Sequence, residues 1–280
     1  MAVRLFTVAL IALSLAAEAA GAPAPRRVMS INLCTDALVL QLLPAERIAS
    51  VTYLSRQAAY APQLGAARAI AVNHGTAEDV LIQKPDLVIG GPYTNATTRK
   101  ILRRLAIPLV EVKEAESFAD IRQVTRQVAT AVGEPARAGL LIAGMDAQLT
   151  SLARTRPARP IRVVAWDGNG AAPGKGTLFD AILSAAGGVN VASSTPDERP
   201  GEYDLERLLV DRPDVIARGS SAASTPSLQS ASAQHPLLRK LYRGREVEYP
   251  ELVYSCGTTQ AAAAAAELRR KLVQAAGLRR

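Results

Sequence analysis

The chain has 280 residues, of which 21% are charged and 49% hydrophobic, a globular composition that excludes disorder. This length suffices for two modest domains or one large one. The net charge of +8 raises the possibility of nucleic-acid binding, but Lys and Arg are scattered and do not alternate with aromatic residues. We therefore interpret the charge as a basic solvated surface and predict no nucleic-acid partner.

The N-terminus predicts export. Met1 to Arg4 is a short basic segment, Leu5 to Ala17 is an unbroken apolar run, and Ala17 and Ala19 are small residues where a signal peptidase reads them. A transmembrane anchor is the alternative, but about 13 apolar residues fall short of the roughly 20 that span a bilayer. We expect a signal peptide over residues 1–19, cleaved after Ala19.

Short strand-like runs then alternate with helical stretches. Strands are predicted at 28–31, 47–51, 86–89 and 109–112, and helices at 35–43, 77–83 and 99–105. Thr76 is the predicted N-cap of the helix at 77–83. This alternation predicts a parallel sheet with helices on both faces.

The middle of the chain, from Phe118 to Arg154, contains only helical spacing, interrupted at 133–135. A helix from Pro135 to Arg154 would be about 30 Å long, enough to connect two lobes. Alternation then resumes, with strands at 161–166, 214–217 and 245–249 and helices at 177–186, 205–210, 236–242 and 259–276.

The two halves share a signature, because residues 78–89 align without a gap to residues 206–217. In each copy a helix ends before a proline, and Pro-Asp leads into a buried strand. Two copies on either side of a long helix indicate pseudo-symmetry. We expect an α/β fold of two pseudo-symmetric lobes with mainly parallel sheets joined by one long helix. The expected divisions are 26–132 for the N-terminal lobe, 133–156 for the helix and 157–280 for the C-terminal lobe.

A catalytic constellation is not visible in the sequence. The only histidines are His74 and His235, and there is no Gly-x-Ser-x-Gly motif. Residues 168–177 are superficially like a phosphate loop, but Asn169 replaces the first glycine, and Gly176 replaces the Ser or Thr after the lysine. Two histidines from different halves do not make a zinc or manganese site. We predict no catalytic residue, no metal site and no cofactor.

Ligands of parallel sheets collect at the loops beyond the carboxyl ends of the strands. Here these loops are 32–36, 52–56, 90–95, 166–169, 218–221 and 254–257. Although only 4% of the chain is aromatic, four aromatic residues fall in these loops, which predicts a cleft for a large and partly apolar ligand. The predicted ligand-binding residues are Cys34, Tyr53, Arg56, His74, Tyr93, Trp166, Arg218, Tyr254 and Cys256.

The order of several motifs carries a family resemblance over essentially the whole mature chain. The motifs are 27–32, 78–89, 105–110, the long helix, 187–191, 206–216 and 244–247. Together they resemble the periplasmic substrate-binding proteins of iron-siderophore and cobalamin ABC importers. The resemblance implies a periplasmic monomer that holds a ferric siderophore, cobalamin or haem between its lobes. It also implies delivery of this ligand to the permease dimer of an inner-membrane ABC importer.

The same resemblance implies a docking role for one carboxylate in each lobe. The matching positions are Glu78 and Glu206, each seven residues before its proline. Two separated surface carboxylates can pair with arginines of a two-fold importer and fix the orientation of the complex. The alternative is that each acid stabilises the dipole of its own helix.

The role of the two cysteines, Cys34 and Cys256, remains open at this point. They are two inert buried thiols, a disulfide between the lobes, or ligand contacts; export permits the disulfide without establishing it. The ligand also remains open. Arg56, Arg218 and Lys175 favour an anionic ferric chelate, whereas the aromatic residues suit a corrin or a haem.

Two other functional classes compete with solute capture. One is an exported α/β enzyme that holds a cofactor between its lobes, and it would need an acid–base or nucleophilic constellation. The other is a scaffold that binds only protein, which would leave the aromatic loop residues without a role.

Overall fold

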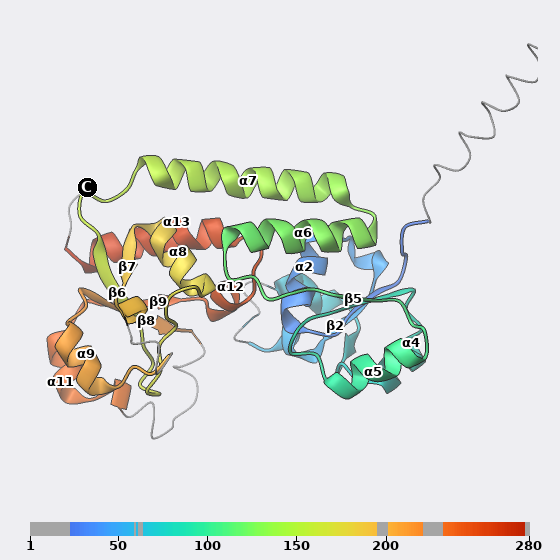
Figure 1. Ribbon diagram of the computed structural model, residues 1–280, viewed down its shortest axis with the longest axis horizontal. Helices are drawn as coiled ribbons and strands as arrows, with labels where there is room; N and C mark the ends of the chain where they lie inside the picture. The colour runs from blue at the N-terminus through green and yellow to red at the C-terminus, as the bar shows by residue number, and fades with distance from the viewer. Residues whose placement is uncertain (1–22, 59, 61–63, 195–200, 221–231, 278–280) are drawn as a thin grey trace, which may run out of the picture.

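A computed structural model describes residues 23–58, 60, 64–194, 201–220 and 232–277. The expected signal peptide, residues 1–19, lies outside the described residues. The predicted fold class is confirmed, because two lobes, each built on one parallel sheet, lie side by side below a long helix (Figure 1).

The N-terminal lobe contains a five-stranded sheet with the order β3-β2-β1-β4-β5, in which neighbouring strands pair in parallel. The strands are β1 (Val28–Ser30), β2 (Ile48–Thr52), β3 (Val72–Asn73), β4 (Leu87–Gly90) and β5 (Leu109–Glu111). The helices are α2 (Leu33–Leu42), α4 (Ala77–Gln83), α5 (Ala96–Arg104) and α6 (Phe118–Val132), with short 3₁₀ turns η1 (Ala45–Arg47), η2 (Tyr53–Arg56) and η3 (Gly65–Ala69).

The C-terminal lobe contains a four-stranded parallel sheet with the order β7-β6-β8-β9. This is the order of the first sheet without its edge strand β3, as pseudo-symmetry requires. The strands are β6 (Ile161–Ala165), β7 (Gly188–Asn190), β8 (Val215–Gly219) and β9 (Glu246–Tyr249). The helices are α8 (Leu178–Ala186), α9 (Leu205–Asp211), α11 (Pro236–Leu241), α12 (Glu251–Ser255) and α13 (Ala261–Ala275), with the 3₁₀ turn η4 (Val191–Ser194).

The sequence repeat forms the same structure in both lobes. Helices α4 and α9 end at Lys84 and Arg212, whose left-handed φ angles are 46° and 45°. The following proline disfavours a right-handed conformation there, so the helix stops and its cap turns left-handed. Asp86 then accepts from the N–H of Arg27, directly before β1, and Asp214 accepts from the N–H of Arg162, within β6. The repeat therefore fixes how each lobe joins a helix to a central strand.

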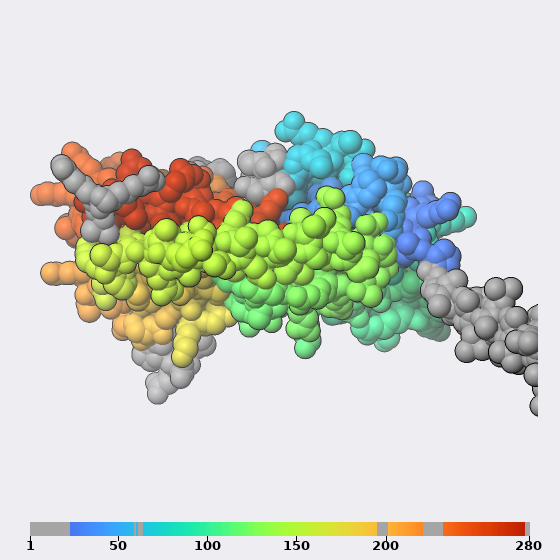
Figure 2. Space-filling model, turned by 90° about the horizontal axis from the view of Figure 1, so that it is seen from above, coloured from blue at the N-terminus to red at the C-terminus, as the bar shows by residue number. Residues whose placement is uncertain are grey.

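Helix α7 (Pro135–Arg154) runs along the length of the molecule and lies across both lobes (Figures 1 and 2). It packs against α6, α8 and α13. Residues from both sheets and from α7 belong to one continuous hydrophobic core. None of the described helices has the length and apolar character that a membrane span requires.

Strand alternation gives each sheet a second, smaller core on its opposite face. In β6, Val163 contributes to the shared core, whereas Val164 faces the core below α9 and α11. Trp166 immediately follows β6 and continues this alternation on the side of Val164. In the N-terminal lobe, Met29 and Val88 occupy the equivalent core below α4 and α5. Strands β3 and β7 and helix α12 were not predicted.

Candidate ligand-binding cleft

Two neighbouring cavities lie at the carboxyl ends of the two sheets. The first has a volume of about 630 Å³ and is lined by loops that follow each strand of the N-terminal sheet, together with α12. The second has a volume of about 330 Å³ and is lined mainly by the loop after β6, by α8 and by the end of β9. Their walls share Glu114, Glu251 and Ser255, so the cavities form one cleft of two chambers. This is the edge at which parallel sheets bind ligands.

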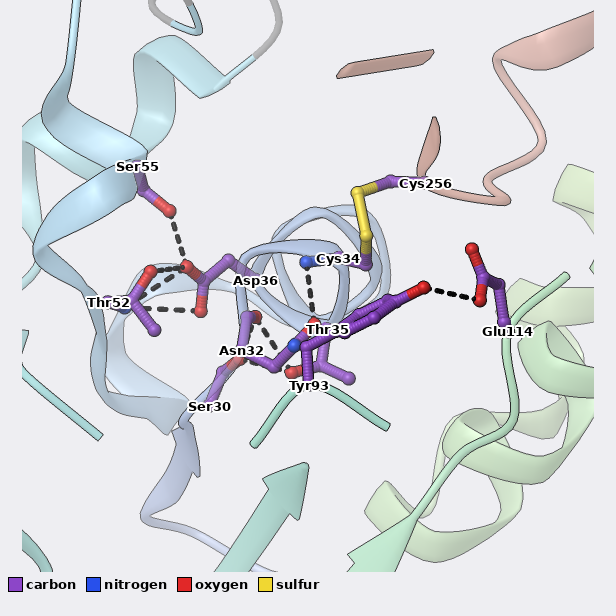
Figure 3. Close-up of a disulfide and its surroundings, with 10 residues drawn as sticks. All are labelled: Ser30, Asn32, Cys34, Thr35, Asp36, Thr52, Ser55, Tyr93, Glu114 and Cys256. Carbon is purple, nitrogen blue, oxygen red and sulfur yellow. Dashed lines mark hydrogen bonds between the residues drawn. A yellow bond between two sulfur atoms is a disulfide. The ribbon is translucent and has the colours of Figure 1, made fainter. Parts of the chain in front are cut away.

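Cys34 and Cys256 form a disulfide, with their Cα atoms 4.8 Å apart (Figure 3). Cys34 lies in the first turn of α2, where its N–H donates to Oδ1 of the capping residue Asn32. Cys256 follows α12 and is buried. Of the three alternatives that the sequence left open, the structure has the disulfide between the lobes. Both cysteines also line the first cavity, so this bond forms part of its wall.

A buried aspartate in the first turn of α2 positions the loop after β2. Asp36 is fully buried, and its carboxylate accepts hydrogen bonds from the N–H and hydroxyl of Thr52 and from the hydroxyl of Ser55 (Figure 3). Burial raises the pKa of Asp36, and the hydroxyl donors partly offset that effect. The bonds hold both ends of η2, which carries Tyr53 to the first cavity. Sequence reasoning assigned Asp36 no such role.

Tyr53 and His74 form a stacked pair in the wall of the first cavity. Their ring centroids are 5.1 Å apart with an interplanar angle of 27°. Tyr53 is 46% exposed, and the His74 side chain is 63% exposed. Both were predicted ligand contacts, and the structure places both at the cleft with open surface.

Tyr93 is the most exposed aromatic side chain of the first cavity, at 75%. Its hydroxyl donates to Oε2 of Glu114 at 2.8 Å (Figure 3). This bond to a carboxylate raises the pKa of Tyr93 above its ordinary value, because the neutral phenol is the form that donates. Tyr93 is therefore a neutral hydrogen-bonding group at physiological pH. Glu114, which the sequence did not single out, lines both chambers.

The second chamber has an aromatic wall. Tyr254 packs against Phe179 and Tyr249, with ring centroids 4.8–5.7 Å apart. Tyr254 is only 5% exposed, and its hydroxyl donates to the carbonyl of Ala264 at 3.3 Å. Asp167 lies in the same chamber and accepts from the N–H of Gly219 at 3.1 Å. Burial raises the pKa of Asp167.

Trp166 and Arg218 lie away from the cleft, contrary to the expectation from their loop positions. Trp166 is 1% exposed, and its Nε1–H donates to the carbonyl of Tyr203 at 2.8 Å in the second core. Arg218 stacks over the Trp166 ring at 5.5 Å, donates to the Trp166 carbonyl at 2.6 Å and pairs with Glu246. Neither residue lines a chamber. Both side chains instead form their contacts within the C-terminal lobe.

The described walls of the two chambers are acidic, although the whole protein is basic and Lys113 lines a small adjoining cavity beside Glu114. Arg56 donates to the carbonyl of Ile70 and does not line a chamber, and Lys175 is likewise absent from both linings. Among the described residues that line the two chambers there is no Lys or Arg. The carboxylates there are Glu114, Glu116, Asp167 and Glu251. In the part of the chain that the structure describes, no three His, Cys, Asp or Glu side chains converge on a metal-binding position.

Glu78 and Glu206 occupy the first turns of α4 and α9, as predicted. Both side chains are exposed and outside the cleft, and neither forms an ion pair with a described residue. One turn later, at matching positions of the repeat, Ile82 and Val210 are 77% and 76% exposed. Each lobe thus presents an acidic and an apolar side chain on the same exposed helix.

The fold and the position of this cleft agree with comparisons to known proteins. The sequence profile described as "Periplasmic binding protein" matches residues 28–243. The chain belongs to the periplasmic binding protein family. It is therefore a binding protein and not an enzyme, as predicted, and the enzyme alternative is excluded.

Individual relatives are named for different ligands. The cobalamin-binding protein of Halobacterium salinarum strain R1 is 26% identical over 212 residues, covering 74% of this chain and 57% of the relative. The chain thus spans little more than half of that relative. The periplasmic haem-binding protein RhuT of Roseiflexus sp. RS-1 has a TM-score of 0.73 at 23% identity, covering 90% of this chain and 99% of RhuT. The vitamin B12-binding protein BtuF of Vibrio cholerae has a TM-score of 0.67 at 18% identity, covering 90% and 98%.

Proposed function

We propose that this protein captures a corrinoid such as cobalamin in the periplasm and delivers it to an ABC importer. The observation that carries the proposal is the charge of the cleft. Haem carries two propionate carboxylates, and ferric siderophores are commonly anionic, so both gain from Lys or Arg in their site. The described cleft instead offers carboxylates, which would repel an anion.

The periphery of a corrin suits this lining better. It carries primary amides, whose N–H groups donate hydrogen bonds that carboxylates such as Glu114 and Asp167 accept. The rings of Tyr53 and Tyr93 provide open apolar surface for the macrocycle. Clefts of several hundred Å³ with aromatic walls and few polar groups are typical small-molecule sites. The printed name of the Halobacterium relative supports the same ligand class.

The proposed delivery to a permease is based on the exposed first turns of helices α4 and α9. Glu78 and Glu206 would pair with basic residues of a two-fold permease, and the neighbouring Ile82 and Val210 would add apolar contact at matching places. We further propose that the signal peptide over residues 1–19 directs the chain to the periplasm. The lobes of the mature monomer are taken as 26–132 and 157–280, joined by the helix at 133–156.

Isothermal titration of the mature protein with cyanocobalamin and with haemin tests the ligand class. We expect saturable binding of cyanocobalamin with one ligand per protein molecule, and much weaker binding of haemin. Replacing Glu114 by Lys should weaken the binding of cyanocobalamin and strengthen the binding of haemin, because it changes the sign of a charge that lines both chambers. Tight haemin binding with no cyanocobalamin binding would overturn the proposal.

Haem is the second candidate because of one specific observation. Tyr93 and His74 both line the first chamber, and tyrosine and histidine are residues that bind haem iron. The absorption spectrum separates the two candidates, since haem bound by either residue has a Soret band distinct from that of free haemin.

A further inference from the structure

We propose that His74 is a ligand of the metal at the centre of the bound corrinoid, through its Nε2 atom. The inference rests on the proposed corrinoid function and adds a metal–protein bond to it. It is carried by a fixed main chain at His74, a carboxylate near Nδ1, and an Nε2 without a partner among the described residues, all in the wall of the first chamber.

The main chain around His74 is held on both sides. The buried Asn73 donates through Nδ2 to the carbonyl of Ser30 at 2.8 Å and to Oγ of Ser50 at 2.9 Å. Its Oδ1 accepts from the N–H of Gly75 at 2.9 Å. The N–H of His74 itself donates to Oδ2 of Asp79 at 2.9 Å. The loop therefore presents His74 from a position that is fixed before a ligand arrives, as precise metal coordination requires.

The imidazole ring is oriented by its two neighbours. One face stacks on Tyr53. Nδ1 lies 3.9 Å from Oδ2 of Asp79, which is too long for a hydrogen bond but places a negative charge on the Nδ1 side of the ring. No described residue offers Nε2 a hydrogen bond. A metal-binding histidine usually donates its second ring N–H to a carboxylate, and a small approach of Nδ1 to Asp79 on ligand binding would complete that arrangement.

Tyr93 lines the same chamber but is a weaker candidate. Its hydroxyl donates to Glu114, and this bond stabilises the protonated phenol, which is a poor metal ligand. His74 is the better donor because its free nitrogen carries a lone pair without losing a proton.

The step is a simple ligand substitution at Co(III). In aquocobalamin, the bond from cobalt to water breaks and the water leaves intact. The Nε2 lone pair forms the new bond to cobalt, the proton stays on Nδ1, and the oxidation state does not change. Cyanocobalamin cannot react in this way, because its cyanide is held much more strongly than water.

Absorption spectra of the mature protein, prepared without a histidine tag, test the proposal with these two ligands. Binding of aquocobalamin should move its γ band to longer wavelength, whereas binding of cyanocobalamin should leave the band unchanged. His74→Phe retains a ring to stack on Tyr53 but has no nitrogen, so it should bind both ligands without a shift. His235→Ala, which removes the only other histidine in the sequence, should keep the shift.

Asp79→Asn supplies a graded variant. The asparagine oxygen can still accept from the His74 N–H, so the loop is retained, but the charge that makes the imidazole a better donor is removed. Loss of such a carboxylate weakens metal binding by roughly 10- to 100-fold, and we expect the preference for aquocobalamin over cyanocobalamin to fall by this order.

The outcomes distinguish this inference from the proposed function. Cyanocobalamin binding together with an unshifted aquocobalamin spectrum in the wild type would overturn the role of His74 and leave corrinoid capture intact. A shift that persists in His74→Phe would overturn it in the same way. Failure to bind either corrinoid would overturn the proposed function itself.

Discussion

The disulfide between Cys34 and Cys256 should contribute a large part of the stability of this protein. It joins residues separated by 222 positions, so it closes most of the chain into one loop. On the chain-entropy account, closing a loop of this length destabilises the unfolded state by about 5 kcal/mol. The free energy of unfolding of a domain is about 5–15 kcal/mol, so a loss of this size is readily measured.

The double variant with Cys34→Ser and Cys256→Ser removes this disulfide and tests its contribution. Urea unfolding followed by circular dichroism should show a free energy of unfolding lower by about 3–5 kcal/mol. The melting temperature should fall by about 6–20 °C, since each kcal/mol shifts a domain of this size by about 2–4 °C. The wild type under reducing conditions is the matched control and should behave like the double variant.

The same bond should also matter for the ligand. It ties the end of α12 to α2, and both helices contribute to the wall of the first chamber. Ligand affinity of the folded double variant should therefore be lower than that of the wild type. The reasoning fails if oxidised wild type, reduced wild type and double variant unfold within about 1 kcal/mol of one another, because the loop-closure term would then be absent.

Four further outcomes follow from individual contacts. Asp36→Asn removes a buried carboxyl whose pKa is raised in the folded state. A raised folded pKa stabilises the wild type at low pH, so the difference in free energy of unfolding between wild type and variant should decrease as pH rises through the folded pKa. Urea unfolding between pH 3 and neutral pH measures this difference. Glu114→Gln should bring the pKa of Tyr93 down toward its ordinary value in an alkaline absorbance titration. Glu206→Ala, like Glu78→Ala, should leave ligand affinity intact but abolish uptake in reconstituted vesicles, and unchanged uptake would exclude docking through these acids. Trp166→Phe should cost about 1–3 kcal/mol of stability by leaving a buried carbonyl unpaired, with no change in ligand affinity of the folded protein.

Local sequence patterns predicted most of the fold. In the helix-Pro-Asp-strand repeat, the end of the helix is specified by a neighbour in the chain, because the proline follows it directly. For the same reason Thr76 was correctly predicted as the N-cap of α4, where it accepts from the N–H of Asp79. The aspartate of the repeat instead accepts from distant residues, Arg27 in the first lobe and Arg162 in the second. The edge of each sheet that lines the cleft was also predicted correctly, because a parallel sheet puts the carboxyl ends of its strands on one edge.

Side-chain direction was much less predictable. Trp166 was assigned to the cleft because it stands where a strand meets a loop, yet it follows the alternation of Val164 into the second core. A shift of one residue reverses the face on which a strand residue lies, and the sequence does not locate the end of β6 to within one residue. Arg218 was misplaced for a related reason, because it lies within β8 and stacks on Trp166.

The acidic cleft was also missed, since net charge is a sum over the whole surface and says little about one concave region. Glu114 lies in a segment without the aromatic residues that guided the prediction of the site, and Glu251 lies three residues before the predicted loop at 254–257. Asp167 did lie in a predicted loop, next to Trp166, and its negative charge was the available indication of an acidic cleft. The disulfide required knowledge of how far apart the lobes are, which no local pattern contains.

The first turn of α2 combines three constraints that the sequence shows only as neighbouring letters. Asn32 caps the helix and lines the first chamber, Cys34 fixes the turn to the other lobe, and Asp36 holds η2 in place. The separation of the lobes and the position of a ligand loop are thus set by the same few residues. The exposed residues Tyr53 and Tyr93, by contrast, contribute little to the core. Ligand specificity can therefore change through these loop tips, while the geometry of the cleft is preserved by α2.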